Sequence, residues 1–177
     1  MPCPVGKAKD KSMIPAAVEA AKAADVAVLF VGSDQTTEAE NFDRREIGLA
    51  GVQEELIAAV AAANPKTVLV LVNGGPLAVE SAKGSVPSII EAFYPGQLGG
   101  DAIVSALTGG VNSFGKLPYT VYFKNFTARD VRDVDLSRGT GVTYRHFSEP
   151  VLWPFGFGLS CAHPLGLTFP SGLKCCI

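Results

Sequence analysis

Four carboxylates and an arginine fall within residues 34–44, which read Asp-Gln-Thr-Thr-Glu-Ala-Glu-Asn-Phe-Asp-Arg. Hydrolysis of a glycosidic bond requires one carboxylic acid that protonates the leaving oxygen and a second carboxylate that acts as nucleophile or base. A general acid must keep its proton near the working pH, which partial burial or neighbouring negative charge achieves. Asp34, Glu38, Glu40 and Asp43 place such charge close together. We expect the arginine that closes the stretch to pair with Asp43 or with a sugar hydroxyl.

Two other interpretations of this acidic stretch stay open. A loop rich in acids can be no more than a solvated surface loop. Clustered carboxylate oxygens also bind hard divalent cations, although no ligand-spacing motif is present here. The stretch follows the apolar run 26–31, which we interpret as a buried strand. That position favours a functional site, because ligands of open α/β sheets bind beyond the carboxyl ends of the strands.

Runs with strand character alternate with helical patterns along the chain. We expect strands at 26–31, 67–72 and 88–93, helices at 15–24, 52–63 and 99–107, a short helix at 77–81, and an edge strand at 116–123. The run 67–72 is continuously apolar and largely β-branched, as in a strand that is buried on both faces. The alternation predicts an α/β fold, with a mostly parallel sheet, helices on both faces and an irregular C-terminal segment. This is a three-layer α/β sandwich.

The loops that follow the three predicted strands should share one edge of the sheet and could build one site. They span residues 32–48, 73–76 and 94–98. The second loop, Asn-Gly-Gly-Pro, lacks the Lys-Ser/Thr of a phosphate-binding loop and the third glycine of a dinucleotide-binding motif, so we interpret it as a tight turn. In the third loop, Gln97 either donates hydrogen bonds to a ligand or caps the helix that begins near Gly99.

Composition excludes several classes of function. The 177 residues carry 15 basic and 17 acidic side chains, with a net charge of -2 and no basic cluster, so nucleic acids and anionic membranes are not expected partners. No apolar run reaches the ~18 residues that span a bilayer, and the first residues lack the apolar core of a signal peptide. The cysteines and histidines lack zinc-ligand spacing, so we expect neither a metal nor a cofactor. The length fits one domain, with tails at 1–12 and 161–177.

Five motifs occur in order along the chain. They are Val-Gly-Ser-Asp-Gln…Glu-Ala-Glu…Asp-Arg at 31–44, Gly-Gly-Pro at 74–76, Tyr-Pro-Gly-Gln…Gly-Gly at 94–100, Gly-Lys-Leu-Pro at 115–118 and Trp-Pro-Phe-Gly-Phe-Gly-Leu-Ser at 153–160. Together they resemble glycoside hydrolase family 3, and within it most closely the β-xylosidase branch. The resemblance covers residues 13–160 and implies the C-terminal α/β sandwich domain of such an enzyme. The tail 161–177 resembles nothing in the family.

The resemblance implies a retaining, exo-acting β-glycosidase that removes terminal β-linked sugars outside the cell. Enzymes of the family combine a (β/α)₈ barrel, which carries the aspartate nucleophile, with a sandwich domain that supplies the general acid/base glutamate. Glu40 matches the family pattern Glu-x-Tyr/Phe-Asp-Arg and is the expected acid/base, with Glu38 as the second candidate. The residues expected to bind substrate are Asp34, Asp43, Arg44 and Gln97.

Nothing in the sequence resembles the barrel or its nucleophile segment. We therefore expect the chain to be inactive by itself, with a carbohydrate substrate and a family 3 barrel domain as its partners. The alternative is a non-catalytic carbohydrate-binding or interaction module derived from such an enzyme. A third interpretation is a metal-binding domain of the flavodoxin type.

Overall fold

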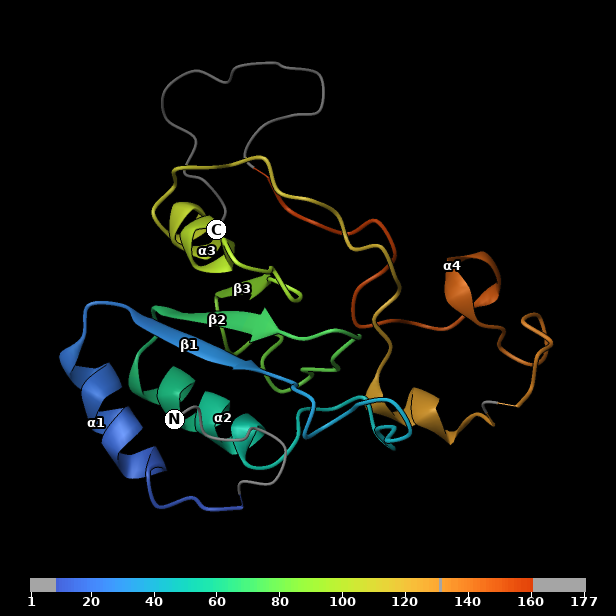
Figure 1. The fold of residues 1–177 in the computed structure, drawn as a ribbon, viewed down its shortest axis with the longest axis horizontal. Helices are drawn as coiled ribbons and strands as arrows, with labels where there is room; N and C mark the ends of the chain where they lie inside the picture. Colours follow the sequence, from blue (N-terminus) through green and yellow to red (C-terminus); the bar gives the residue numbers. More distant parts are fainter. Residues whose placement is uncertain (1–8, 131, 161–177) are drawn as a thin grey trace. The chain divides into compact units, whose positions relative to one another are not determined.

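The structure is a computed structural model that describes residues 9–130 and 132–160. The chain divides into two compact units: unit 1 is Met1–Tyr94 with Tyr122–Asp130, and unit 2 is Pro95–Val121 with Val131–Ile177. Its elements, labelled in Figure 1 apart from the 3₁₀ helix η1, are α1 (Ile14–Ala23), β1 (Ala27–Gly32), α2 (Gln53–Ala63), β2 (Thr67–Val72), β3 (Ser88–Glu91), α3 (Gly99–Leu107), η1 (Lys124–Ala128) and α4 (Thr143–His146). No helix in the described residues is both long enough and apolar enough to cross a membrane. The predicted tails lie largely outside those residues.

A parallel sheet with the strand order β1-β2-β3 forms the centre of unit 1. β2 is the central strand: Ala27 of β1 pairs with Thr67, and Val68 pairs with Ser88 of β3. A central strand is covered on both faces, which explains why Leu69 and its neighbours in β2 form an unbroken apolar run. The predicted α/β class with a parallel sheet is confirmed, and β2 has the predicted bounds.

The prediction that the strand at 26–31 is buried is wrong for three of its six residues, the first of which is Val26 at 49% exposed. The side chains of Val28 and Phe30 are 41% and 56% exposed, and only the end of β1, at Val31 and Gly32, is buried. β1 is an outer strand of the described sheet, and successive side chains of a strand point to opposite faces. One face of β1, at Val28 and Phe30, is left largely uncovered within the described residues.

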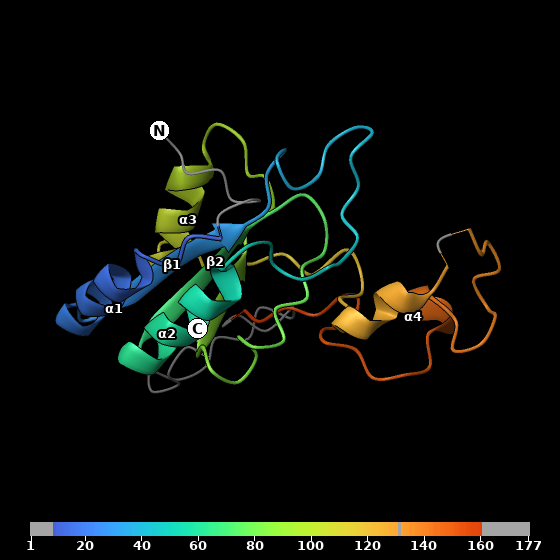
Figure 2. The ribbon, with the colours of Figure 1, turned by 90° about the horizontal axis from the view of Figure 1, so that it is seen from below.

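Two helices lie side by side on one face of this sheet. α2 packs against β1 and β2, and α1 packs against α2 (Figures 1 and 2). The side-chain amide of Asn64 ties the two helices together, since its Nδ2 donates to the carbonyl oxygens of Ala21 at 2.9 Å and Ala24 at 3.0 Å. The backbone of Asn64 is extended, as expected of a residue that precedes a proline. The predicted end of the helix at Asn64-Pro65 is confirmed.

The short helix predicted at 77–81 is wrong. Leu77, Ala78 and Val79 are all buried, and the N–H of Ala78 donates to the carbonyl oxygen of Ile47 at 2.7 Å. Three consecutive residues of a helix spread over more than half of its circumference, so a surface helix cannot bury all three. The segment instead runs without helical structure until a turn begins at Glu80.

Unit 2 contains α3, α4 and loops, two of which are paired with each other. Backbone hydrogen bonds join Leu117 to Phe157 at 2.8 Å and Val121 to Trp153 at 2.8 Å, so the two segments run antiparallel. These bridges take the place of the edge strand predicted at 116–123, which does not form as a regular strand.

Gly32→Ala tests how closely β1 and β2 approach. A β-carbon at Gly32 would lie 1.8 Å from the carbonyl oxygen of Val72, so the strands would have to separate. We expect the free energy of unfolding, measured by urea denaturation, to fall by about 3 kcal/mol or more. The control is Gly100→Ala in α3, where an added methyl group meets nothing within 4 Å and alanine favours the helix. If Gly32→Ala had the same urea midpoint as the wild type, the close approach of β1 and β2 at Gly32 and Val72 would be contradicted.

Candidate active site

The acidic stretch folds into a small hairpin with Glu40 at its tip. The N–H of Ala39 donates to the carbonyl oxygen of Phe42, and the N–H of Phe42 donates back to Ala39, both at 2.9 Å. Asn41 completes the turn with a φ of 64°, a left-handed conformation that asparagine tolerates better than most residues. Glu40 is exposed, and its carboxylate has no hydrogen-bond or ion-pair partner among the described residues. Both of its oxygens are therefore available to a ligand.

Glu38 differs from Glu40, because it is held by an arginine. Arg44 Nε lies 2.5 Å from Glu38 Oε2, and both terminal nitrogens of Arg44 lie 3.4 Å from the carbonyl oxygen of Pro76. The two side chains are largely shielded from solvent, so this contact is stronger than a typical surface ion pair. The pair fixes the position of the hairpin against the loop that follows β2.

The expectation that Arg44 pairs with Asp43 is wrong. Asp43 is exposed, whereas Arg44 turns inward to Glu38. The two neighbouring side chains therefore lie in different surroundings, one in solvent and one partly buried, and are not placed to pair. A role of Asp43 in substrate binding stays a prediction.

Asp34 shapes the beginning of the acidic stretch. Its Oδ1 accepts hydrogen bonds from Thr36 N at 2.9 Å and from Thr36 Oγ1 at 2.6 Å. Its carbonyl oxygen accepts from the N–H groups of Thr37 at 2.9 Å and Glu38 at 3.1 Å. An aspartate that bonds to backbone two residues further on is a common way to start a turn. Asp34 thus organises the loop, and its predicted contact with substrate stays a prediction.

Within unit 1, the loops after β1 and β2 meet at one edge of the sheet together with Tyr94, the first residue of the third predicted loop, and the rest of that loop belongs to unit 2. Tyr94, which follows β3, donates its hydroxyl to the carbonyl oxygen of Ser33 at 3.0 Å. The loop after β2 reaches the acidic stretch through the contact between Arg44 and Pro76. Gln97 belongs to unit 2. The N-cap of α3 is Leu98 without a side-chain cap, so Gln97 does not cap that helix, and its role toward a ligand stays a prediction.

A buried glutamine, which the sequence did not single out, anchors the start of the site. Gln53 Oε1 accepts from Gly32 N at 2.8 Å, and Gln53 Nε2 donates to Gly32 O at 3.0 Å and to Ala50 O at 2.9 Å. The side-chain amide of Gln53 thereby makes, with the backbone of Gly32 at the end of β1, the two hydrogen bonds that a neighbouring strand would make. Its position at the first residue of a helix directly after the acidic loop was the only signal in the sequence.

Glu91 was also missed. It ends β3, and burial raises the pKa of its carboxyl to about 7, although hydrogen bonds from the Phe93 N–H and the Asn73 side chain oppose the shift. Asn73 is fully buried at the end of β2, and its Oδ1 has no hydrogen-bond partner. The sequence signal was a glutamate inside the apolar run Ser-Ile-Ile-Glu. An acid with such a pKa can hold or release a proton near neutral pH.

No group of three or more histidine, cysteine, aspartate and glutamate side chains within the described residues could hold a metal ion. The hairpin instead combines an unengaged carboxylate at its tip, Glu40, with a carboxylate fixed by an arginine, Glu38. Chemically, a single carboxyl group that is open to a ligand can donate and accept a proton.

Comparisons with known proteins identify the family of the chain. Residues 5–161 match the family described as the glycosyl hydrolase family 3 C-terminal domain. Beta-D-xylosidase 1 of Arabidopsis thaliana is 45% identical over 152 residues, which cover 82% of this chain and 20% of that protein. The Beta-xylosidase of Formosa agariphila is 39% identical over 158 residues, which cover 85% of this chain and 21% of that protein. A solved structure of a GH3 exo-beta-xylosidase (XlnD) in complex with a xylobiose aziridine probe matches with a TM-score of 0.84 and 30% identity, over 90% of this chain and 22% of that chain.

The α/β sandwich with its acidic loop is thus a domain of the glycoside hydrolase class. The chain belongs to glycosyl hydrolase family 3, and it corresponds to the C-terminal domain of β-xylosidase-like and β-glucosidase-like members. The resemblance inferred from the five motifs is confirmed. The chain spans about a fifth of the length of the curated relatives that it matches.

Arg44→Gln tests whether the pair with Glu38 holds the hairpin. The change leaves a half-buried carboxylate without its counter-ion, so we expect the free energy of unfolding to fall by about 2 kcal/mol. Amide hydrogen exchange across the acidic stretch should also become faster. The control is Arg45→Gln, because Arg45 is exposed and has no partner among the described residues. Equal effects of the two variants would show that the pair does not fix the loop.

Glu91 should make stability depend on pH. Its pKa rises from an ordinary value of 4.5 to about 7, so the folded state binds more protons than the unfolded state between these values. The stabilisation by protonated Glu91 is therefore complete below about pH 4.5 and is lost as the pH rises through 7. Relative to Glu91→Gln, we expect the wild type to lose roughly 2 kcal/mol across this window, allowing for partial exposure. Urea denaturation at both ends of the window measures the free energy of unfolding of the two proteins. If wild type and Glu91→Gln differed by the same amount at both pH values, the prediction would be refuted.

Proposed function

We propose that this chain is the acid/base domain of a retaining, exo-acting β-glycosidase of the β-xylosidase type, with Glu40 as the general acid/base. The observation that supports this most is the contrast between the two glutamates of the hairpin. Glu38 is bound by Arg44, whereas Glu40 stands exposed at the tip without a partner in the described chain. Of these two glutamates, Glu40 is the one with both carboxyl oxygens available for a glycosidic oxygen in the described chain.

In the proposed mechanism, the nucleophile is an aspartate of a family 3 barrel domain, as the family resemblance implies. This aspartate attacks the anomeric carbon while Glu40 gives its proton to the departing oxygen, so the glycosidic bond breaks and a glycosyl-enzyme ester forms. Glu40 then takes a proton from water, whose oxygen attacks the anomeric carbon and releases the sugar and the aspartate. Retention requires the two carboxyl groups to lie ~5–5.5 Å apart, so the exposed hairpin tip must reach the pocket of the barrel.

The other predicted site residues receive supporting roles in this proposal. The Arg44–Glu38 pair holds the hairpin in place, and Asp34 sets the turn that leads into it. Asp43 and Gln97 are exposed and are proposed to contact sugar hydroxyls. No metal or cofactor takes part.

The proposed substrate is a terminal β-linked xylosyl residue, because relatives with high identity carry the name β-xylosidase. Other relatives are named β-glucosidases, so a terminal glucosyl residue is the nearest alternative. The xylosyl assignment would place the enzyme in xylan degradation outside the cell, in line with the family.

A second candidate function is a non-catalytic carbohydrate-binding or interaction module. The observation that favours it is the exposure of aromatic side chains in unit 2, among them Tyr144 and Phe155. This candidate predicts sugar binding by the chain without any hydrolysis, even when a barrel domain is present.

Complementation with a barrel domain tests the catalytic proposal. The 177-residue chain alone should not hydrolyse xylobiose or an aryl β-xyloside. Mixed with the separately produced barrel of a related β-xylosidase, it should restore hydrolysis of both. With Glu40→Gln in the mixture, kcat/KM for xylobiose should fall by about 10²–10⁴-fold. The value for dinitrophenyl β-xyloside should fall far less, because a dinitrophenolate leaves without protonation.

Glu38→Gln is the matched control for this experiment. It removes a carboxylate from the same hairpin and should lower kcat/KM for both substrates by a similar factor, since it acts on loop position and not on leaving-group protonation. If the chain alone hydrolysed either substrate, and Glu40→Gln abolished that activity, the need for a barrel domain would be contradicted. If kcat/KM fell selectively for xylobiose in Glu38→Gln and not in Glu40→Gln, Glu38 would be the general acid/base in place of Glu40.

A further inference from the structure

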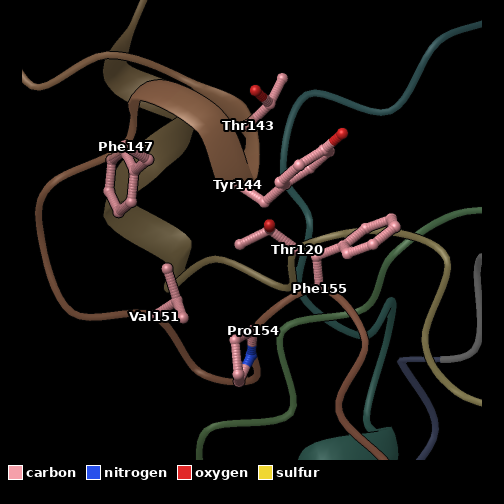
Figure 3. Close-up of a pocket in the computed structure, with 7 residues that line it drawn as sticks. All are labelled: Thr120, Thr143, Tyr144, Phe147, Val151, Pro154 and Phe155. Carbon is pink, nitrogen blue, oxygen red and sulfur yellow. The ribbon is translucent and has the colours of Figure 1, made fainter.

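A concave site in unit 2 takes no part in the proposed chemistry. It is a pocket of about 360 Å³, and the residues that line it are Thr120, Thr143, Tyr144, Phe147, Val151, Pro154 and Phe155. Figure 3 shows these side chains arranged around a common space, with Thr120 extending toward its middle. The volume falls in the range of small-molecule sites in proteins. None of the lining side chains is charged, so the pocket suits a neutral ligand.

The walls of this pocket are fixed by backbone hydrogen bonds. The bridge between Val121 and Trp153 holds Thr120 opposite the segment that continues into Pro154. The other wall is a closed loop, because Ser148 N donates to Thr140 O at 3.0 Å and Phe147 N donates to Thr143 O at 3.0 Å. The pocket is therefore formed before any ligand arrives, which lowers the entropic cost of binding.

Thr143 adopts a backbone conformation that its side chain disfavours. Its φ of 63° lies in the left-handed region, where a β-branched residue is a genuine outlier. Nearby, Gly141 also has a positive φ of 73°, and a β-carbon there would lie 2.2 Å from the carbonyl oxygen of His146. Strained residues of this kind cluster at ligand sites in proteins.

The floor of the pocket contains a buried hydroxyl without a partner. Thr120 is 8% exposed, and its Oγ1 makes no hydrogen bond among the described residues. A buried hydroxyl that has lost contact with water and has gained no partner is costly. A ligand that carries hydroxyl groups of its own would satisfy Thr120, whereas a purely apolar ligand would not.

The rim of the pocket presents aromatic rings. Tyr144 and Phe155 stack with their centroids 4.4 Å apart and an angle of 25° between the rings, yet they are 57% and 46% exposed. Arg145 holds Tyr144 in place, since its Nε donates to the Tyr144 hydroxyl at 3.2 Å. Exposed aromatic faces next to a hydrogen-bonding group match a ligand with one apolar face and polar edges. A pyranose ring, with C–H groups on its faces and hydroxyls around its edge, has this chemistry.

We propose that this pocket of unit 2 binds one neutral pyranose ring of an oligosaccharide, with Thr120 Oγ1 bonded to a sugar hydroxyl and the ring against Tyr144 and Phe155. No carboxyl group lines the pocket, so the sugar is bound there without being cleaved. The proposal goes beyond the acid/base function and involves none of the residues of the acidic hairpin.

A titration of the full 177-residue chain with xylotriose tests the proposal. Trp153 is the single tryptophan of the chain and precedes Pro154 and Phe155, so its fluorescence reports on the pocket. We expect a saturable change with a dissociation constant of about 1 mM, confirmed by calorimetry. Thr120→Val, which keeps the shape and removes the hydroxyl, should weaken binding about tenfold. Phe155→Ala should abolish it.

Phe157→Ala is the matched control, because Phe157 is an exposed phenylalanine of the same segment that does not line the pocket. It should bind xylotriose like the wild type. Circular dichroism checks the folding of each variant, and Thr120→Val carries the test if Phe155→Ala does not fold. The absence of saturable binding at about 20 mM xylotriose, or equal losses in Phe155→Ala and Phe157→Ala, would overturn the proposal. Tighter binding of cyclohexanol than of xylotriose would overturn it as well. The titration needs neither a barrel domain nor turnover, so its failure would leave the proposal for Glu40 intact.

Discussion

The site depends on how the chain leaves β1, and the amide of Gln53 determines this. In a parallel sheet, Gly32 directs its N–H and C=O away from β2, and no further strand lies there within the described residues. Gln53 supplies both missing partners from the first residue of α2. The two ends of the acidic loop, one at the strand and the other at the helix, are thereby joined. Between them, the turn at Asp34 and the Arg44–Glu38 pair hold the hairpin with Glu40 at its tip.

The sheet could be predicted because its strands are defined by local composition. β2 is an unbroken apolar and largely β-branched run, and the turn chemistry of Asn64-Pro65 marks where the preceding helix ends. The end of β3 was less predictable. The strand stops at Glu91, and Phe93 has a φ of 54°, a left-handed conformation that a phenylalanine side chain does not predict. The helix predicted around Ala78 was wrong because its local sequence does not reveal its burial. Its residues suit a helix locally, but burial of three in succession requires another conformation.

The partners of the site residues could be predicted only in part, because they come from residues that are distant in sequence. Motif spacing pointed to the glutamates of the hairpin, but not to which one an arginine would bind. The inward turn of Arg44 toward Pro76, on the loop after β2, is a tertiary contact. The raised pKa of Glu91 likewise results from burial at the end of a short strand, which a single glutamate in an apolar run does not reveal. The pocket of unit 2 joins Thr120 to residues of the segment 143–155, and only a structure brings these together.

The topology of the sheet also has a consequence for how the chain folds. The partner of β1 begins at Thr67, beyond the whole acidic loop and α2, and the partner of β2 begins only at Ser88. Every strand pairing therefore closes a long loop, which slows folding relative to proteins whose contacts are local. During synthesis, β1 leaves the ribosome before either of the other strands does. Val28 and Phe30 are then open to intermolecular contacts, and they keep one exposed face even after the sheet has formed. Chaperone demand during expression should therefore be set by this strand.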